Sequence, residues 1–286
     1  MKLNKNANTN ILIVGLGLLG GSYAMALKKK GYHVEAITRS QSTIDYALEH
    51  HLIDAGSIQV DAEMIQRAEL IVFALYPHVF MNWIKENQHL FKPSTVLTDV
   101  TGVKGSVVYE IQEMLREDVE FIAAHPMAGK EVYGVENSDD RIFAGANYIV
   151  VPTDKNTPEA IALCEELGRE LGFRSVSCLS PEKHDEMIAY LSQLTHCIAV
   201  TLMCCHDNEH LVKYTGDSFR DLTRIAKIND AMWSELFMMN KDQLLAQMDL
   251  FMEKFQELRN DLVNDNLDDM RAMMRLSTER RKLFDK

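Results

Sequence analysis

The stretch ILIVGLGLLGGSYAMAL, residues 11–27, decides how the rest of the chain is interpreted. It carries no charge and lies behind Lys2 and Lys5, so a secretion signal, a membrane anchor and a buried strand that turns into a helix all have to be considered. Residues 24–26 (AMA) are similar to a signal-peptide cleavage site. The glycines in the stretch oppose both targeting alternatives, because glycine weakens the helix that a signal or an anchor requires. We therefore favour the strand and turn.

The glycines of this stretch have the spacing of a dinucleotide-binding turn. The pattern G-x-G-x-x-G at residues 15–20 follows a predicted strand and opens a predicted helix. The first glycine permits a tight turn, the second lets the backbone approach a pyrophosphate, and the third lets the helix pack on the strand. The helix N-terminus offers unpaired N–H groups to the phosphates. The expected cofactor contacts are Gly15, Gly17, Leu18, Leu19 and Gly20.

The end of the second predicted strand indicates which dinucleotide is bound. NAD-specific sites normally carry Asp or Glu there, which binds the ribose 2′-hydroxyl. This strand, residues 33–38, ends in Thr38-Arg39-Ser40 with no acid at its tip. Two hydroxyls and a guanidinium suit a 2′-phosphate better. The sequence therefore predicts NADP as the preferred cofactor and leaves NAD possible; the alternative is that Arg39 only faces solvent.

Short apolar runs alternate with helical segments in the first half of the chain. The expected strands are residues 10–14, 33–38, 70–75, 95–98, 121–124 and 148–151. Their nearly continuous apolar character is typical of parallel strands that are covered on both faces. A helix at 20–30, ended by Gly31, completes a β-α-β unit with the first two strands. The predicted fold class is an α/β Rossmann-type doubly wound sheet.

The pattern changes to helices after residue 153. We expect a helix at 158–171, a short strand at 175–178, and helices to the end, with a helix start at Ser180-Pro181-Glu182. Residues 188–205 hold no formal charge, but their polar side chains make a poor membrane span, so a helix buried in protein is expected. The predicted domains are 1–175, the dinucleotide-binding Rossmann domain, and 176–286, an all-helical C-terminal domain.

Composition excludes some classes of partner. The formal net charge is −12, which argues against nucleic acid because a phosphate backbone selects basic surfaces. The chain has five cysteines, and none lies in a C-x-x-C pair or near a plausible histidine ligand set. We expect reduced thiols, a cytoplasmic location, no metal site and no membrane association.

Three further segments are not explained by packing alone. The first is AHPMAG, residues 124–129, just past a predicted strand at the edge where open α/β sheets bind ligands. The second is LTH, residues 194–196, within the uncharged helix. The third is DSFRDLTRIA, residues 217–226, followed by Met232-Trp233. Taken alone, His196 favours a structural role, as most isolated histidines do.

Together these segments resemble the prephenate/arogenate dehydrogenase family of tyrosine biosynthesis. The resemblance covers about residues 10–286 and rests on HPMAG, SQLTH, SFRDLTRIA and MWSELFMMN behind the G-x-G-x-x-G domain. The strand end TRSQST, residues 38–43, is similar to that of NADP-dependent members. The resemblance implies a helical domain that dimerises and NAD(P)-dependent oxidative decarboxylation of prephenate to 4-hydroxyphenylpyruvate. The alternative is an arogenate dehydrogenase that produces tyrosine directly.

The resemblance also implies roles for single residues. His125 takes the proton of the substrate's C4 hydroxyl while hydride leaves C4, a task that suits a neutral imidazole. Arg224 holds a substrate carboxylate with its planar guanidinium; the alternative is an intrahelical pair with Asp221. The other substrate-binding residues that it implies are His196, which lines the pocket, and Arg220 and Trp233 at its edge, across a dimer interface.

Three positions bear on which substrate is used. Many relatives carry a serine where this chain has Gly102. Thr101 is the nearest hydroxyl, and we expect it to replace that serine as a catalytic group. Some relatives carry a second histidine where Gln193 stands, so Gln193 is expected to contact substrate. Asp217 is either an acid that favours the ammonium group of arogenate or a helix cap. Prephenate stays the first expectation.

Two rival functions remain open at this point. Another two-domain Rossmann oxidoreductase, such as a β-hydroxyacid dehydrogenase or an imine reductase, is one of them. The β-hydroxyacid dehydrogenases usually rely on a catalytic lysine in the helical domain, and the candidates Lys213 and Lys227 lie in no supporting motif. The second rival is a non-catalytic cofactor-binding regulator, which the glycine at 102 motivates.

Overall fold

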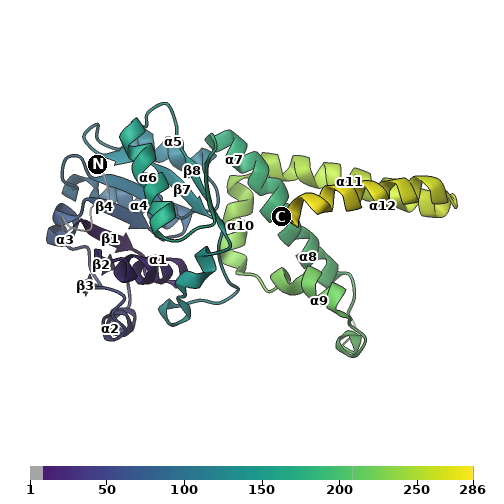
Figure 1. Cartoon of the computed structure of the whole chain (residues 1–286), viewed down its shortest axis with the longest axis horizontal. Coiled ribbons are helices and arrows are strands. Elements are labelled where there is room, and N and C mark those ends of the chain that lie inside the picture. The colour runs from purple at the N-terminus through teal and green to yellow at the C-terminus, as the bar shows by residue number, and fades with distance from the viewer. Residues whose placement is uncertain (1–8, 208, 286) are drawn as a thin grey trace.

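The computed structural model describes residues 9–207 and 209–285, so Lys2 and Lys5, which entered the signal-peptide alternative, lie outside it. The chain forms an α/β domain followed by a helical domain that ends in a long hairpin pointing away from the sheet (Figure 1). This arrangement confirms the predicted fold class.

A six-stranded parallel sheet forms the centre of the first domain. Its strand order is β3-β2-β1-β4-β5-β6, so the order reverses beside β1. The strands are β1 (Asn10–Val14), β2 (His33–Ile37), β3 (Ala55–Ser57), β4 (Leu70–Phe73), β5 (Val96–Asp99) and β6 (Glu120–Phe121). The crevice at the carboxyl ends of β1 and β4 is therefore the point where this fold class binds dinucleotides.

Helices cover both faces of the sheet, as the apolar strands require. Ile11 and Ile13 of β1 pack with one face, and Leu12 and Val14 pack with the other. The first face is covered by α1 (Leu18–Lys29), α2 (Gln41–Glu49) and α6 (Pro158–Glu170). The second is covered by α3 (Ala62–Arg67), α4 (Pro77–Asn87) and α5 (Gly105–Met114). These four β1 side chains are at most 2% exposed, and only Asn10, at the start of β1, is partly exposed.

A smaller sheet carries the residues that follow β6. It consists of β7 (Ala123–Pro126), β8 (Asn147–Val151) and β9 (Ser175–Cys178), with β7 antiparallel to β8. The expectation that all these strands run parallel was wrong here, because loops and short 3₁₀ turns return the chain directly from β7 to β8 without a crossover helix. The expected strand 121–124 is split at Ile122, and the expected boundary at residue 175 falls inside β9. The first domain therefore extends to Cys178.

The second domain consists of helices. They are α7 (Pro181–Ile188), a π-helical segment (Ala189–Leu194), α8 (Thr195–Cys204), α9 (Asp217–Thr223), α10 (Asp230–Met239), α11 (Lys241–Val263) and α12 (Leu267–Arg281). α11 and α12 form the terminal hairpin, which turns at Asp265 with φ of 54°. Ser180 caps α7 by accepting a hydrogen bond from the backbone of Lys183, as predicted.

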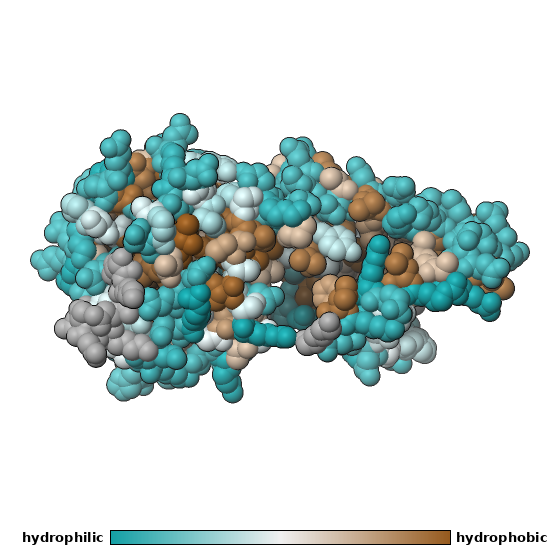
Figure 2. Space-filling view, turned by 45° about the horizontal axis from the view of Figure 1, so that its top comes forward, coloured by the Kyte–Doolittle hydropathy of each residue, from teal (hydrophilic) through white to brown (hydrophobic). Residues whose placement is uncertain are grey.

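The uncharged helix is far less buried than expected. By length and composition the helical run Pro181–Cys204 could cross a membrane, and only 28% of its most apolar window is buried within the chain. The expectation of a helix buried in protein is therefore met only in part within this chain. Further apolar side chains of the second domain are exposed, among them Phe255 at 63% and Met238 at 67%. Figure 2 shows apolar side chains at the surface of this helical half.

Candidate active site

The turn after β1 has the shape that the glycine spacing predicts. Gly15 has φ of 98°, and a Cβ there would lie 2.4 Å from the carbonyl oxygen of Ala74. A Cβ on Gly20 would lie 2.0 Å from the carbonyl oxygen of Gly15. A Cβ on Gly17, at the N-terminus of α1, would meet nothing within 4 Å. Protein atoms therefore lie against Gly15 and Gly20, whereas the space beside Gly17 is open. This fits a pyrophosphate that approaches the backbone beside Leu18 and Leu19.

The tip of β2 presents the three residues that were expected to select the dinucleotide. The backbone N–H of Thr38 donates to the carbonyl of Ser57 at 3.0 Å, which fixes the tip. Ser40 caps α2, and its Oγ lies 2.8 Å from the Oγ of Ser42. Arg39 is exposed, and no partner holds its guanidinium within the described part of the chain. These residues fit the adenosine end of a dinucleotide and leave Arg39 available to a phosphate.

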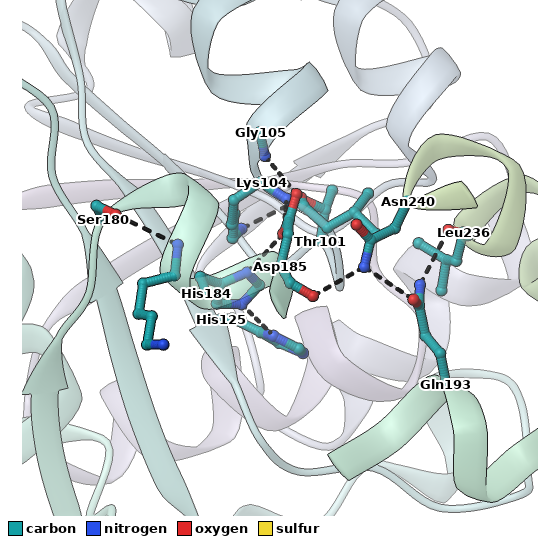
Figure 3. A network of polar contacts seen from close by, with 12 residues as sticks. Thr101, Lys104, Gly105, His125, Ser180, His184, Asp185, Gln193, Leu236 and Asn240 are labelled. Atoms are coloured by element: carbon teal, nitrogen blue, oxygen red, sulfur yellow. Dashed lines mark hydrogen bonds and ion pairs between the residues drawn. The ribbon is translucent and has the colours of Figure 1, made fainter. Parts of the chain in front are cut away.

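His125 lies near the end of β7 and has an unexpected partner. Its Nδ1 is 2.9 Å from Nε2 of His184, and Nδ1 of His184 is 2.8 Å from a carboxylate oxygen of Asp185 (Figure 3). Burial lowers the pKa of His125 well below 6.5, and the neighbouring His184 and Lys104 lower it further. His125 is therefore neutral near pH 7, and its ring remains partly exposed.

A buried ion pair fixes the backbone just before His125. Nζ of Lys104 lies 2.6 Å from a carboxylate oxygen of Asp99 and 2.6 Å from the carbonyl oxygen of Ala124. The N–H of Ala124 donates to the other Asp99 oxygen at 3.1 Å. Burial lowers the pKa of Lys104, although Asp99 opposes that shift. Both polar groups of Ala124 are thus bound to one ion pair, which holds His125 in place.

Thr101 does not occupy the place expected for it. Its hydroxyl donates to Asp99 and accepts from Lys104 Nζ at 3.2 Å, inside the buried network. The role of a catalytic hydroxyl beside His125 is therefore corrected to a structural one. A Cβ on Gly102 would lie 3.5 Å from Leu236 and 3.9 Å from Cε1 of His125. Leu236 of α10 thus lies against Gly102.

Gln193 joins two helical segments. Its amide nitrogen donates to the carbonyl of Leu236 at 3.0 Å, and its amide oxygen accepts from Asn240 at 2.9 Å. Asn240 also donates to the backbone carbonyl of Asp185 at 2.9 Å. Gln193 is 1% exposed, so its side chain ties the π-helical segment to α10. A direct contact between Gln193 and substrate stays a prediction.

His196, Trp233 and Arg224 gather on the helical side of the site. The rings of His196 and Trp233 stack with centroids 3.7 Å apart, and Nδ1 of His196 lies 2.9 Å from the carbonyl of Ser192. Burial lowers the pKa of His196. Arg224 bonds to Glu131, which lies in the loop after β7, and forms no pair with Asp221 as the alternative proposed. The Glu131 charge raises the pKa of His196 and the Arg224 charge lowers it, and α8, which carries His196, packs against the segment Arg224–Ala226.

Arg220 and Asp217 bind each other on the outside of α9. Nη2 of Arg220 lies 2.6 Å from Asp217, and their side chains are 59% and 88% exposed. The cap of α9 is Gly216, so the helix-cap alternative for Asp217 was wrong. Arg220 contacts Asp217 and Thr215 of its own chain, and the roles of Asp217 and Arg220 toward substrate stay predictions.

Sequence reasoning missed the residues that support His125. These are His184 and Asp185, which follow the helix start at Ser180. The carboxylate of Asp185 accepts hydrogen bonds from the backbone N–H groups of Lys104 and Gly105 at 2.9 and 2.8 Å. The sequence feature that could have indicated them is a histidine next to an aspartate, one turn after a strong helix cap. No such signal marks Glu131. In the described chain, no three His, Cys, Asp or Glu side chains are grouped so as to hold a metal ion.

The arrangement defines a class of chemistry. A neutral histidine lies in β7, next to β5, a dinucleotide turn follows β1, and an arginine comes from the helical side. Figure 2 shows a hollow between the two domains, bordered by apolar side chains. A site of this kind is able to take a proton from a hydroxyl while hydride leaves the same carbon of an anionic substrate.

Comparison with known families gives two matches that together span most of the chain. Residues 23–177 match the nucleotide-binding domain of prephenate dehydrogenase, and residues 180–276 match the dimerization domain of prephenate dehydrogenase. The junction between the two matches lies at the end of β9, where the structure places the domain boundary.

Individual relatives point the same way. The chain is 30% identical to a prephenate dehydrogenase of Bacillus subtilis, over 87% of this chain and 69% of the relative. It is 27% identical to a cyclohexadienyl dehydrogenase of Zymomonas mobilis, over 91% and 90%. Among solved structures, prephenate dehydrogenase from Aquifex aeolicus with hydroxyphenyl propionate and NAD+ superposes with a TM-score of 0.88, at 27% identity over 96% of this chain and 98% of that one.

Proposed function

The chain belongs to the prephenate dehydrogenase family, and we infer from this that it oxidatively decarboxylates prephenate to 4-hydroxyphenylpyruvate in tyrosine biosynthesis. The chain is an oxidoreductase that uses a nicotinamide cofactor. The observation that supports this reaction most strongly is that His125, at the edge of the sheet, is neutral and is held by His184. The membership removes the two rivals, another Rossmann oxidoreductase and a non-catalytic regulator, as first choices.

His125 is the proton acceptor in this proposal. Its Nδ1 is taken by His184, so Nε2 is the nitrogen left to accept the proton of the substrate's C4 hydroxyl. The bound nicotinamide supplies the chemistry of hydride acceptance at C4. The turn of Gly15, Gly17 and Gly20 would hold the cofactor, and Gly17 is the one of these glycines that is open to it. Asp99 and Lys104 keep His125 at a fixed place by binding Ala124.

Substrate anchoring falls to the helical side. Prephenate has two carboxylates, and Arg224 offers a planar guanidinium that binds a carboxylate through two parallel hydrogen bonds. Its side chain is 64% exposed beside Glu131, which leaves room for a second anion. His196, stacked on Trp233, forms a neighbouring wall. We keep prephenate as the first substrate and arogenate as the alternative, which an acid such as Asp217 would favour.

The proposed cofactor preference is for NADP over NAD. Three residues support it: Thr38, Arg39 and Ser40 follow β2 with no acid among them, and Arg39 is exposed there. An acid would repel a 2′-phosphate, whereas a free guanidinium attracts one. NAD is the alternative cofactor.

The proposed assembly is a cytoplasmic homodimer. The match to a dimerization domain and the exposed apolar side chains of α8, α11 and α12 support it. The uncharged run in the π-helical segment and α8 is then a subunit contact and not a membrane span. Phe255→Glu, on the exposed face of α11, should shift the protein from dimer to monomer in light scattering. Glu253→Gln is the control on the same helix, and a wild-type monomer at all concentrations would exclude the dimer.

One experiment tests the function itself. The purified chain is mixed with prephenate or arogenate and with NADP or NAD, and reduced nicotinamide is followed by its absorbance while released CO₂ is trapped. The expected result is turnover with equal amounts of reduced cofactor and CO₂, fastest with prephenate and NADP. Turnover of neither substrate with either cofactor would overturn the proposal.

A further inference from the structure

The relay behind His125 is built from residues of two domains. His125 belongs to β7, and its partners His184 and Asp185 belong to α7. His184 is fully buried, and its two ring nitrogens are both engaged, at 2.9 Å with His125 and at 2.8 Å with Asp185. Figure 3 shows the contacts that run from His125 to His184 and from His184 to Asp185.

Asp185 is fixed as an acceptor at the far end of this relay. Oδ1 accepts from the backbone N–H of Lys104 at 2.9 Å, and Oδ2 accepts from that of Gly105 at 2.8 Å. These are the N–H groups at the start of α5, which lack partners inside the helix. A Cβ on Gly105 would lie 3.0 Å from Oδ2, so the glycine makes room for the carboxylate. Backbone N–H groups only donate, so both oxygens of Asp185 act as acceptors here.

This fixed acceptor determines where every proton of the relay lies. Since Asp185 accepts, Nδ1 of His184 carries a hydrogen, and in a neutral ring Nε2 of His184 is then the acceptor. His125 must therefore donate from Nδ1, which leaves the lone pair on its Nε2. Burial lowers the pKa of both histidines, and this supports the neutral state. The charged groups that face the pair are Lys104, Asp99 and Asp185.

We propose that His184 and Asp185 are positioning residues that hold His125 as the tautomer with a basic Nε2 and share the positive charge while His125 carries the substrate's proton. The proposal rests on the proposed function and deepens it, because it names the residues that make the base competent. The logic is that of the buried aspartate in serine proteases, which sets the tautomer of a catalytic histidine.

The proton balance of the reaction suits a relay that ends inside the protein. The C4–H bond breaks with its electron pair, which reduces the nicotinamide, and the O–H proton passes to Nε2 of His125. The ring carboxylate then leaves as CO₂, and its electron pair makes the ring aromatic. The oxygen takes the proton back as a phenol, so none is released. Asp185 is only 6% exposed, and a proton that is returned needs no path from it to solvent.

Two variants at one position test the relay. His184→Leu removes both hydrogen bonds, and kcat should fall by roughly 10²- to 10³-fold while KM stays within about threefold. His184→Gln offers an amide oxygen to His125 and an amide N–H to Asp185, so it should recover at least about tenfold of that loss. The control is His50→Leu, an exposed histidine on the first domain, with unchanged kcat. Thermal unfolding shows whether each variant folds.

A spectroscopic measurement separates the relay from the proposed function. With ¹⁵N-labelled histidine and NADP bound, the shifts of His125, assigned with His125→Asn, should show hydrogen on Nδ1 and none on Nε2. A wild-type His125 protonated on Nε2 would overturn the relay. So would an unchanged kcat in His184→Leu, or no recovery in a folded His184→Gln. Absence of turnover in the wild type would instead contradict the proposed function, and the tautomer would still decide the relay.

Discussion

Arg39 is the single residue on which the cofactor preference depends. Its guanidinium is exposed at the tip of β2, in the position where an acid would bind a ribose hydroxyl. Arg39→Asp should reverse the ratio of kcat/KM for NADP over NAD, because the new carboxylate repels a 2′-phosphate and accepts a hydroxyl. The measurement is the ratio before and after the change. Lys30→Asp, an equal charge change at the end of α1, is the control, and an equal ratio in wild type and Arg39→Asp would mean that Arg39 only faces solvent.

Single residues also show which parts of the site can be predicted from the sequence. His125 was found because its segment follows a strand end, and Gly15 because its spacing reports a backbone constraint. His184 was missed because its role depends on a contact with His125, which lies 59 positions away in the chain. Thr101 was misjudged because the sequence says that a hydroxyl is present but not which way it points. The structure turns it toward Asp99.

At the scale of elements, α10 joins the two domains at the site. Asn229, just before the helix, donates to the hydroxyl of Tyr76 at 2.9 Å, and Glu235 accepts from the backbone of His78 at 2.8 Å. On the same helix Leu236 lies against Gly102, and Trp233 stacks on His196. The helix therefore sets both the catalytic and the substrate-binding sides.

The segment after α9 meets the loop after β7 through Arg224 and Glu131. Arg224→Lys keeps the charge but loses the planar, two-pronged grip, so KM for prephenate should rise by roughly 10- to 100-fold with a smaller loss of kcat. Initial rates over a range of prephenate concentrations measure this. Arg169→Lys, an exposed arginine that pairs with Glu165 on α6, is the matched control. An unchanged KM in Arg224→Lys would remove Arg224 from carboxylate binding.

Elements were predicted best where local chemistry decides them. The continuous apolar run at 10–14 and the capped start at Ser180 are confirmed residue for residue. The strand β3 was missed because its three residues, Ala55 to Ser57, have no apolar run of their own and are held by pairing with β2. The antiparallel direction of β7 and β8 depends on how the intervening loop returns, which no local pattern states.

At the scale of the whole molecule, the buried histidines make stability depend on pH. Burial lowers the pKa of His125, His184 and His196 below the ordinary 6.5 in the folded state. Below about pH 6.5 the unfolded chain therefore binds more protons, and the free energy of unfolding falls as pH decreases toward the folded pKa values. Denaturant melts between pH 5 and 8 should show this loss, and His184→Gln should make it shallower. Equal stability at both ends of that range would contradict the three shifts.

The whole molecule also explains why one predicted helix is less buried than expected. The uncharged run at 188–205 was expected to be a helix buried in protein, yet most of it is at least partly exposed within this chain. A sequence reports that a helix needs a cover but not whether the cover comes from the same chain. The proposed homodimer supplies that cover.

The central claim is that His125 is the base of an oxidative decarboxylation. The most direct measurement is steady-state turnover of prephenate with saturating NADP by the wild type and by His125→Asn, with NADP affinity measured separately. The account predicts that kcat falls by roughly 10²- to 10⁴-fold while NADP affinity is unchanged, because the base is lost and the cofactor turn is intact. A His125→Asn enzyme that turns over as fast as the wild type would contradict it.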